Sequence, residues 1–375
     1  MGTLQLSPNV LEWAANNVGI SVDLLADKVA AASKKEAFIQ GKLTPSQAEQ
    51  VSKLTHTPFG FLFLEAPPTI EKRTLPDLRQ TPHPEPLSHD FYDTLDDILR
   101  KQEWYSDHLK EMGEDPLPFV GRYSVTEVTS YAEVALDIKK TIGLTDEDRN
   151  QCSNFEDYYD LLTQKTEAAG ILLFKSGIVR SNTKRGLSVK EFRGFAIADK
   201  LAPVIFINGK DSPAAWIFTL AHEVAHIWLG QSGISDNPAG ADSNKAELAC
   251  NRIAAELLTP TQQFIEAWKK NKGANIDELS RIFKVSRLVI ARRALDLKKT
   301  SLDFYKKIEE ESKKQAATSG GNPYYTIPVR NSKRFTHALV VSAMSGHTMI
   351  REAARLLNIK PNTLMELGRR LAKRG

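Results

Sequence analysis

Residues 220–228 have the sequence LAHEVAHIW and lie within a largely apolar segment that spans residues 214–229. The preceding residues 211–213, Asp-Ser-Pro, form a helix-start signal, because serine caps a helix and proline fits its first position. Residues four apart share one face of a helix, so the imidazoles of His222 and His226 point the same way. The pattern H-E-x-x-H on a helix therefore predicts two metal ligands one turn apart.

The competing interpretation is structural, since an isolated histidine on an apolar helix is usually a hydrogen-bonded core residue. Two histidines with Glu223 between them fit that interpretation poorly. Burying the three side chains without a metal ion leaves several polar groups that lack partners, at a cost of roughly 1 to 3 kcal/mol each. The sequence therefore favours a metal site.

A third ligand should lie beyond this helix, because catalytic zinc usually takes three protein ligands and leaves one position for water. The arrangement with a third histidine, H-E-x-x-H-x-x-G-x-x-H, is excluded because Leu229 and Ser232 occupy the glycine and histidine positions. Glu247 is the preferred third ligand. Asp236 and Asp242, in the intervening loop, are the alternatives.

The helix predicted over residues 245–258 also carries Asn251, one turn after Glu247 and on the same side. Asn251 is a candidate to orient a metal ligand through a hydrogen bond, and an ordinary polar helix residue is the equally good alternative. In the chemistry that this site predicts, zinc lowers the pKa of its bound water and Glu223 takes the water proton. Peptide hydrolysis is the natural reaction.

Composition sets broad limits on the protein class. A chain of 375 residues predicts two or three folding units, and 50 basic against 46 acidic residues neither require nor exclude a nucleic-acid partner. No run of eighteen apolar residues predicts a membrane span, and the first residues lack the pattern of a secretory signal. Cys152 and Cys250 make a poor disulfide framework, so we expect a cytoplasmic protein without a membrane partner.

Local patterns predict the order of elements. Residues 7–64 read as four or five short helices, with capping boxes at Ser33 with Glu36 and at Thr44 with Gln47. Further predictions are an extended connector at 69–86, helices at 88–115 and 125–142, strands at 171–174, 192–197 and 204–207, helix pairs around tight turns at 276–297 and 348–372, and an exposed linker at 311–331.

Several stretches resemble the ImmA/IrrE family of metallopeptidases, namely Gly194-Phe195 and residues 204–208, 218–226 and 247–260. The resemblance is strong across residues 170–260. It extends weakly to residues 10–14, 58–64, 67–68 and 75–79, which resemble family members with an N-terminal Xre-type helix-turn-helix. The chain departs from the family pattern at Thr259, where methionine is expected, and before Gly41, where a tryptophan often stands.

The resemblance implies an α+β fold, in which a zincin-like core with a small sheet and the H-E-x-x-H helix follows an all-α helix-turn-helix domain and precedes helical extensions. The expected domains are an Xre-like helix-turn-helix domain at 1–68, a connector with helices at 69–145, the metallopeptidase core at 146–262, a helix-turn-helix-like extension at 263–310, and a linker with a C-terminal helical segment at 311–375.

The resemblance also implies a function. Zinc or another divalent metal would be held by His222, His226 and Glu247, and the protein would cut a helix-turn-helix repressor or a similar regulator, and so control stress, mobile-element or defence genes. The alternative is a non-catalytic, DNA-binding transcriptional regulator or antitoxin that retains a metal site.

Basic residues near each end of the chain are candidate contacts to DNA or to a protein partner. In the N-terminal segment these are Lys34, Lys35, Gln40 and Lys42, with a solvated helix face as the alternative. In family members the region of the first helix pair often packs on the peptidase, so we expect a structural role there, and Arg287, Arg292 and Arg293 are phosphate contacts only if that expectation fails. The last pair, around residues 351–370, has the same two interpretations.

Overall fold

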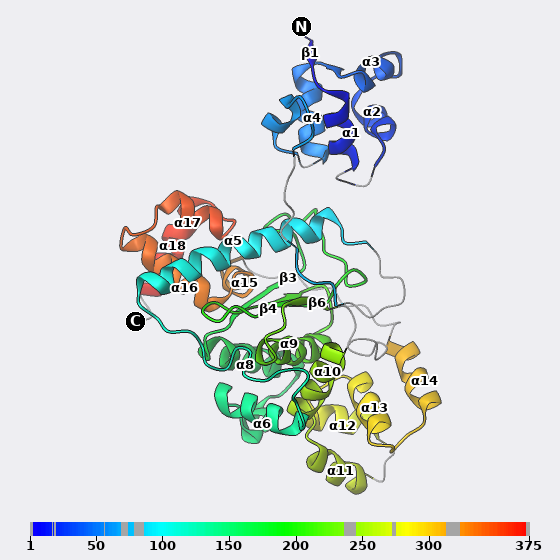
Figure 1. Cartoon of the computed structure of the whole chain (residues 1–375), viewed down its shortest axis with the longest axis vertical. Helices are drawn as coiled ribbons and strands as arrows, with labels where there is room; N and C mark the ends of the chain where they lie inside the picture. The colour runs from blue at the N-terminus through cyan, green and yellow to red at the C-terminus, as the bar shows by residue number, and fades with distance from the viewer. Residues whose placement is uncertain are drawn as a thin grey trace. The chain divides into compact units, whose positions relative to one another are not determined.

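The computed structural model describes residues 3–16, 18, 20–55, 57–68, 74–78, 86–235, 245–271, 275–312 and 323–372. The chain divides into two compact units, one formed by residues 1–73 with 87–92 and the other by residues 74–86 with 93–375 (Figure 1). Each unit has its own buried apolar cluster.

The N-terminal unit consists of short helices around a small core. Its elements are β1 (Leu4–Gln5), α1 (Pro8–Asn16), α2 (Val22–Val29), η1 (Ala32–Lys34), α3 (Lys35–Ile39), β2 (Lys42–Leu43), α4 (Pro45–Thr55) and η2 (Phe59–Phe63). The capping box predicted for α4 is confirmed, because Thr44 and Gln47 exchange side-chain to backbone hydrogen bonds of 2.9 and 3.3 Å. The box predicted at Ser33 is wrong, since α3 begins after Lys34 and has no side-chain cap.

The expectation of an all-α N-terminal unit is also wrong in one detail, because β1 and β2 pair in antiparallel fashion. Gly41 allows this pairing. Its φ of +88° is readily adopted only by glycine, and a Cβ atom there would lie 2.0 Å from the backbone oxygen of Leu6. Two-residue strands are too short for alternation of apolar and polar residues to reveal them.

A mixed four-stranded sheet forms the centre of the larger unit. Its strands are β3 (Leu172–Ser176), β4 (Gly194–Ile197), β5 (Val204–Asn208) and β6 (Gly233–Ser235), in the order β3-β5-β4-β6. β3 and β5 are parallel, and β4 is antiparallel to both β5 and β6. The first three strands confirm the sequence prediction, whereas β6 is too short to show a periodic pattern.

Residues 76–78 lie along the outer edge of β6. The Leu78 N–H donates to the Ile234 carbonyl at 3.1 Å, and the Ile234 N–H donates to the Pro76 carbonyl at 3.0 Å. Gly233 makes room for this segment, since a Cβ atom there would lie 2.2 Å from Cδ1 of Leu78. The predicted connector is therefore extended at this point but, contrary to expectation, is paired with the sheet.

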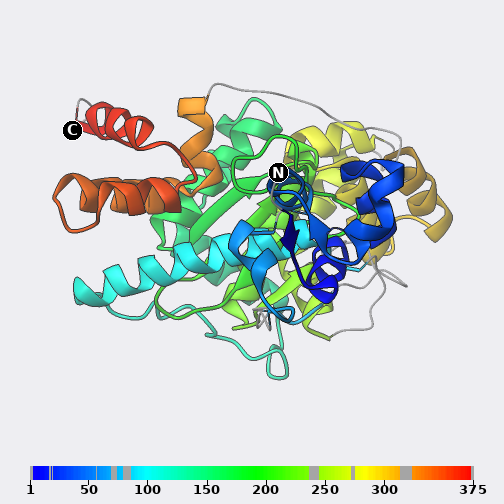
Figure 2. The same ribbon diagram turned by 90° about the horizontal axis from the view of Figure 1, so that it is seen from above.

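Helices cover both faces of the sheet (Figure 1 and Figure 2). On one face, α5 (His89–Glu111) packs over β3, with Lys101 Nζ 5.8 Å from the ring centroid of Phe174. On the other face, α8 (Phe155–Ala168) and α9 (Pro213–Trp228) lie against the strands, and α6 (Tyr131–Ile142) and α10 (Lys245–Leu258) pack on α9. Along the chain, α7 (Asp146–Gln151) precedes α8 and α11 (Thr261–Lys270) follows α10. The helices at 146–168 are absent from the sequence prediction.

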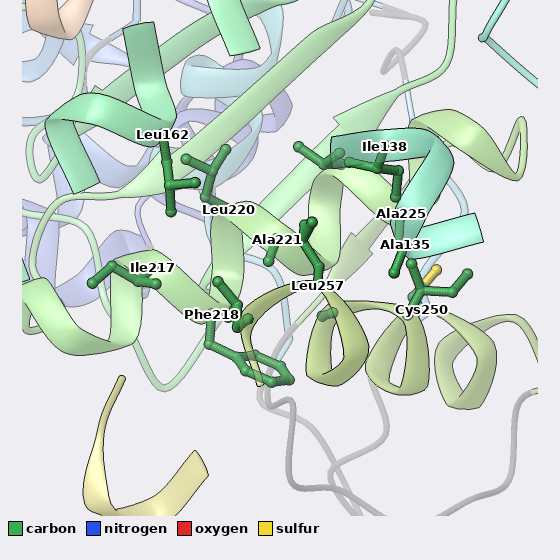
Figure 3. Packing of buried hydrophobic residues seen from close by; sticks show 14 of the residues in the cluster. Ala135, Ile138, Leu162, Ile217, Phe218, Leu220, Ala221, Ala225, Cys250 and Leu257 are labelled. Carbon is green, nitrogen blue, oxygen red and sulfur yellow. The ribbon is translucent and has the colours of Figure 1, made fainter. Parts of the chain in front are cut away.

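The largest core lies where α9 meets its neighbours (Figure 3). The cluster combines Ile217, Leu220 and Ala225 of α9 with Leu162 of α8, Ile138 of α6 and Cys250 of α10. Because α9 is surrounded in this way, its two histidines and its glutamate are held in the interior of the unit.

The remaining helices are α12 (Ile276–Phe283), α13 (Arg287–Asp296), α14 (Leu302–Ser312), α15 (Pro323–Arg330), α16 (Lys333–Met344), α17 (Ile350–Leu356) and α18 (Pro361–Ala372). Both predicted helix pairs are confirmed as α12–α13 and α17–α18. Part of the predicted linker is instead helical, in α15, which accommodates Pro328 near its end. Residues 313–322 of that linker lie outside the described residues.

Candidate metal centre

Helix α9 presents the H-E-x-x-H residues to the interior. It begins as predicted, with Ser212 Oγ accepting a hydrogen bond from the Ala215 N–H at 3.3 Å. From Ile217 to Trp228 every side chain is buried. His222 is 3% exposed, and Glu223 and His226 are fully buried. Such burial of three polar side chains requires strong local partners.

Helix α10 supplies the third group. Glu247, in its first turn, is 3% exposed and faces α9. Its Oε2 lies 3.1 Å from Nε2 of His222, and its Oε1 lies 2.9 Å from Nε2 of His226. The two Nε2 atoms are 3.0 Å apart. The three side chains thus converge on one point, as the sequence analysis expected of them.

The donor set fits a divalent cation. Zinc binds imidazole nitrogen at about 2.0–2.1 Å and carboxylate oxygen at about 2.0–2.2 Å, so tetrahedral ligand atoms lie roughly 3.3 Å apart. The observed separations between the ligand atoms are close to that value. Two imidazoles and one carboxylate form a ligand set that catalytic zinc commonly takes. His222, His226 and Glu247 could therefore hold a metal ion.

Asn251 supports this arrangement from one turn further along α10. Its Oδ1 lies 2.9 Å from Nδ1 of His222 and can accept a hydrogen bond from it. A proton on Nδ1 leaves the lone pair of the neutral imidazole on Nε2, which is the atom that faces Glu247 and His226. The contact is the one that the sequence analysis weighed for Asn251 against an ordinary helix position.

The charges of the three converging groups depend on one another. Burial raises the pKa of Glu247, but the two imidazoles outweigh this effect and lower that pKa to about 2. Burial lowers the pKa of His222, but the Glu247 carboxylate outweighs it and raises that pKa to about 9. Burial is also the main reason why the pKa of His226 is lowered. The negative charge that holds a proton on His222 would equally hold a cation.

Glu223 lies beside this centre without a hydrogen-bond partner among the described residues for either carboxylate oxygen. Burial raises its pKa to about 8, and Glu247 adds to the rise while His222 and Ser235 oppose it. On strand β4, Gly194 leaves room for the carboxylate, because a Cβ atom there would lie 2.9 Å from Glu223 Oε1. Glu223 is thus a buried carboxylate with a high affinity for a proton.

Gly194 and Ser235 border Glu223, but neither was predicted from the sequence as part of this site. Gly194 entered only through the family resemblance, and its role depends on the approach of β4 to α9, which the local sequence does not encode. Ser235 lies on the unpredicted strand β6.

The position that would hold a third histidine in the excluded pattern is a described residue, whereas the two alternative third ligands are not. Ser232, at the position of a third histidine, is engaged elsewhere, since its Oγ accepts a hydrogen bond from the Ala198 N–H at 2.9 Å. Asp236 and Asp242 lie outside the described residues.

The structure places the four N-terminal candidates in and around α3. Lys34, Gln40 and Lys42 are exposed. Lys35 Nζ lies 2.8 Å from Asp27 Oδ1, so its charge is partly neutralised. At five residues, α3 is short for a helix that reads DNA.

Comparisons with known proteins identify two segments. The family model described as the IrrE N-terminal-like domain, Peptidase_M78, matches residues 167–295, which include every residue of the candidate centre. A domain of unknown function, DUF8813, matches residues 331–370. Neither the comparison with curated proteins nor that with solved structures found a match.

The family match and the geometry agree. Residues 167–295 form an IrrE-like Peptidase_M78 domain with a buried His222, His226 and Glu247 group, and the chain is accordingly a metalloendopeptidase. Within the described part of the chain, no helix combines the length and the apolar composition that a membrane span requires.

Proposed function

We propose that this protein is a zinc-dependent, site-specific endopeptidase that cleaves a helix-turn-helix repressor or a similar regulatory protein. The observation that carries the proposal is the convergence of His222, His226 and Glu247 within 3.1 Å of one another, next to the carboxylate of Glu223, which has no hydrogen-bond partner among the described residues. Zinc is the favoured ion because two imidazoles and a carboxylate suit it, although other divalent metals accept the same ligands.

The proposed chemistry assigns a role to each side chain. When bound, the ion polarises the scissile carbonyl and acidifies the attacking water. Glu223 takes a proton from that water and later delivers it to the amide nitrogen as the C–N bond breaks. Asn251 holds the His222 ring through Nδ1, so that its Nε2 lone pair stays directed at the centre. Water addition and proton return balance the hydrolysis of one peptide bond.

Two features support a protein regulator as the substrate. The first is the resemblance of the peptidase segment to the ImmA/IrrE family, together with the match to the IrrE-like domain. The second is the attachment of this domain to further small helical units at both ends of the chain, which suit recognition of a folded macromolecule better than general digestion. The substrate class rests on these features and not on the metal centre itself.

The proposal is tested by incubating the purified full chain and zinc with a panel of purified helix-turn-helix repressors, including any encoded beside its gene. We expect discrete fragments from at least one repressor. Glu223→Gln should abolish cutting while zinc affinity stays close to that of the wild type. Glu310→Gln, an exposed carboxylate on α14, is the matched control and should cut normally.

The outcomes separate the leading function from its alternative. Undiminished cutting by Glu223→Gln would remove the proposed base from the reaction. If the wild type binds zinc tightly but leaves every repressor intact, the non-catalytic regulator or antitoxin becomes the better account of the chain.

A further inference from the structure

The last three helices form a compact trihelical unit. α17 and α18 are joined by residues 357–360, and Asn358 in this turn has a φ of +55°. Two helices joined by a tight turn with a left-handed residue, packed on a third helix, form a helix-turn-helix arrangement. The unit coincides with the separate family match at residues 331–370, so it is a module distinct from the peptidase domain.

Its interior is small and closely packed. Ala353, Ala354 and Leu357 of the α17 side meet Leu364 and Leu367 of α18, and all five are buried. Gly368 brings α18 close to α16, since a Cβ atom there would lie 2.8 Å from Sδ of Met344. The fixed packing gives α18 one inner face and one outer face.

The outer face of α18 combines polar, apolar and basic residues, and Glu366 pairs with both Arg369 and Arg370, at 3.8 and 3.0 Å. Asn362, Met365 and Arg369 are exposed at positions that share one side of a helix, while Leu364 and Leu367 point inward. Arg351 and Arg355 are exposed on α17, and Lys360 is exposed in the turn. From residue 345 to residue 372 there are five arginines and lysines against two glutamates. The net positive charge is therefore concentrated on the helices that the motif would present to DNA.

In the other helix pair, the arginines form ion pairs within the protein. In α12–α13, Arg293 is 3% exposed and bonds Glu256 and the Thr259 carbonyl, at 2.6 and 3.0 Å. Arg287 pairs with Asp277 and Glu311, at 3.1 and 3.2 Å. That pair is part of the peptidase core, as expected. By contrast, Arg351, Arg355 and Lys360 form no ion pair with any described residue, so their charges remain available.

The trihelical unit is held to the rest of the larger unit by α16 and by the turn between α17 and α18. Asn358 Nδ2 donates to both carboxylate oxygens of Asp97 on α5, at 2.9 and 3.0 Å. The Ser181 hydroxyl donates to the Asn358 carbonyl at 2.7 Å, and Arg334 Nε donates to the Tyr105 hydroxyl at 2.7 Å. These contacts fix the unit while leaving the basic residues exposed to solvent.

We propose that α17 and α18 form a binding surface for double-stranded DNA. α18 enters the major groove, where Asn362 faces the base edges, and Arg351, Arg355 and Lys360 contact phosphates on either side. This surface is separate from the metal centre and from the N-terminal candidates, so the inference does not depend on the proposed function. It makes the chain a peptidase that is positioned on DNA.

The test is fluorescence anisotropy of the full chain with a labelled 30-base-pair duplex from the region upstream of its own gene and with a scrambled duplex of equal composition. Arg351→Ala/Arg355→Ala removes two exposed charges that form no ion pair with the described part of the chain. Lys306→Ala/Lys307→Ala removes two exposed charges on α14 and is the matched control. Thermal unfolding of each variant verifies that the fold is intact.

We expect the wild type and the α14 variant to bind equally, and Arg351→Ala/Arg355→Ala to bind at least about tenfold more weakly. Two lost phosphate contacts should also reduce the slope of log K against log salt by about 1.8. Asn362→Ala should reduce the preference for the native duplex over the scrambled duplex while leaving that slope unchanged. Glu223→Gln should bind DNA like the wild type.

Three results would overturn the proposal. Equal weakening by both double variants would show that binding reflects net charge alone. Loss confined to Lys34→Ala/Lys42→Ala would assign DNA binding to the N-terminal unit. Absence of DNA binding, combined with binding of polyglutamate that Arg351→Ala/Arg355→Ala abolishes, would identify an acidic protein as the partner.

Discussion

Asn251→Leu is the substitution that most directly tests how the metal centre is organised. The wild-type amide oxygen lies 2.9 Å from Nδ1 of His222, and leucine has a similar volume but accepts no hydrogen bond. Without this acceptor the neutral ring can place its proton on either nitrogen, and the tautomer with the proton on Nε2 cannot bind the ion through that atom, which is the one that faces the centre. We therefore expect weaker zinc binding in an otherwise folded protein.

The magnitude follows from two independent considerations. A buried N–H that loses its partner costs about 1–3 kcal/mol. Loss of a hydrogen bond to a metal-ligating histidine typically lowers metal affinity about 10- to 100-fold, which corresponds to roughly 1.4 to 2.8 kcal/mol. Because Asn251 is half-buried and water can partly replace the amide, the effect should fall toward the lower half of this interval.

The assay is competition for zinc against a colorimetric chelator at pH 7, with the unfolding temperature of the metal-free protein measured in parallel. Asn251→Asp keeps an acceptor near Nδ1 and adds negative charge, so its zinc affinity should equal or exceed that of the wild type. If Asn251→Leu binds zinc as tightly as Asn251→Asp does, the hydrogen bond to His222 does not organise the centre.

Three further substitutions or treatments have defined outcomes. In Gly194→Ala the new Cβ would lie 2.9 Å from Glu223 Oε1 and from the Phe206 carbonyl, so we expect cleavage to slow by about 100-fold in kcat assays while chelator competition shows zinc affinity unchanged. Chelation of zinc should lower the free energy of unfolding in urea by about 4 kcal/mol, compared with the wild type in zinc at 1,000 times its Kd. If chelation lowered the free energy of unfolding of Glu247→Gln by the same amount, the ion would be bound elsewhere. Burial lowers the pKa of Lys175 from 10.5 to about 8, so between these pH values the unfolded chain binds more protons and stability rises with pH. The free energy of unfolding of the wild type minus that of Lys175→Met should thus increase by up to about 3 kcal/mol from pH 8 to 10.5 in urea titrations, and a constant difference would contradict the lowered pKa.

The metal centre could be anticipated from the sequence because its geometry is largely local. His222 and His226 are one turn apart on a helix whose start was marked by Ser212 and Pro213, and each of these signals acts over four residues or fewer. Glu247 was harder to assign, since its approach depends on the packing of α10 against α9. It could still be selected, because the competing histidine pattern fails at Leu229 and Ser232.

The parts that could not be anticipated are those decided by distant segments. Strand β6 has three residues, and its stability comes from pairing with β4 on one side and with residues 76–78 on the other. Gly194 resembles any glycine in a strand until α9 places Glu223 against it. In both cases the structural role depends on a contact with a distant segment of the chain, which the local sequence does not predict.

The two helix pairs also differ in a way that the local sequence does not predict. Both have an amphipathic pattern, a tight turn and several arginines, so local sequence assigns them the same two interpretations. What separates them is the position of carboxylates far along the chain. Glu256 lies 37 residues before the arginine that it pairs with, Arg293, and Arg287 pairs with Glu311. The buried guanidinium of Arg293 stabilises the peptidase core and cannot be withdrawn for phosphate without leaving Glu256 unpaired, which costs several kcal/mol. Arg351 and Arg355 differ, because no described carboxylate pairs with them. They can bind DNA phosphates without breaking an ion pair that stabilises the fold.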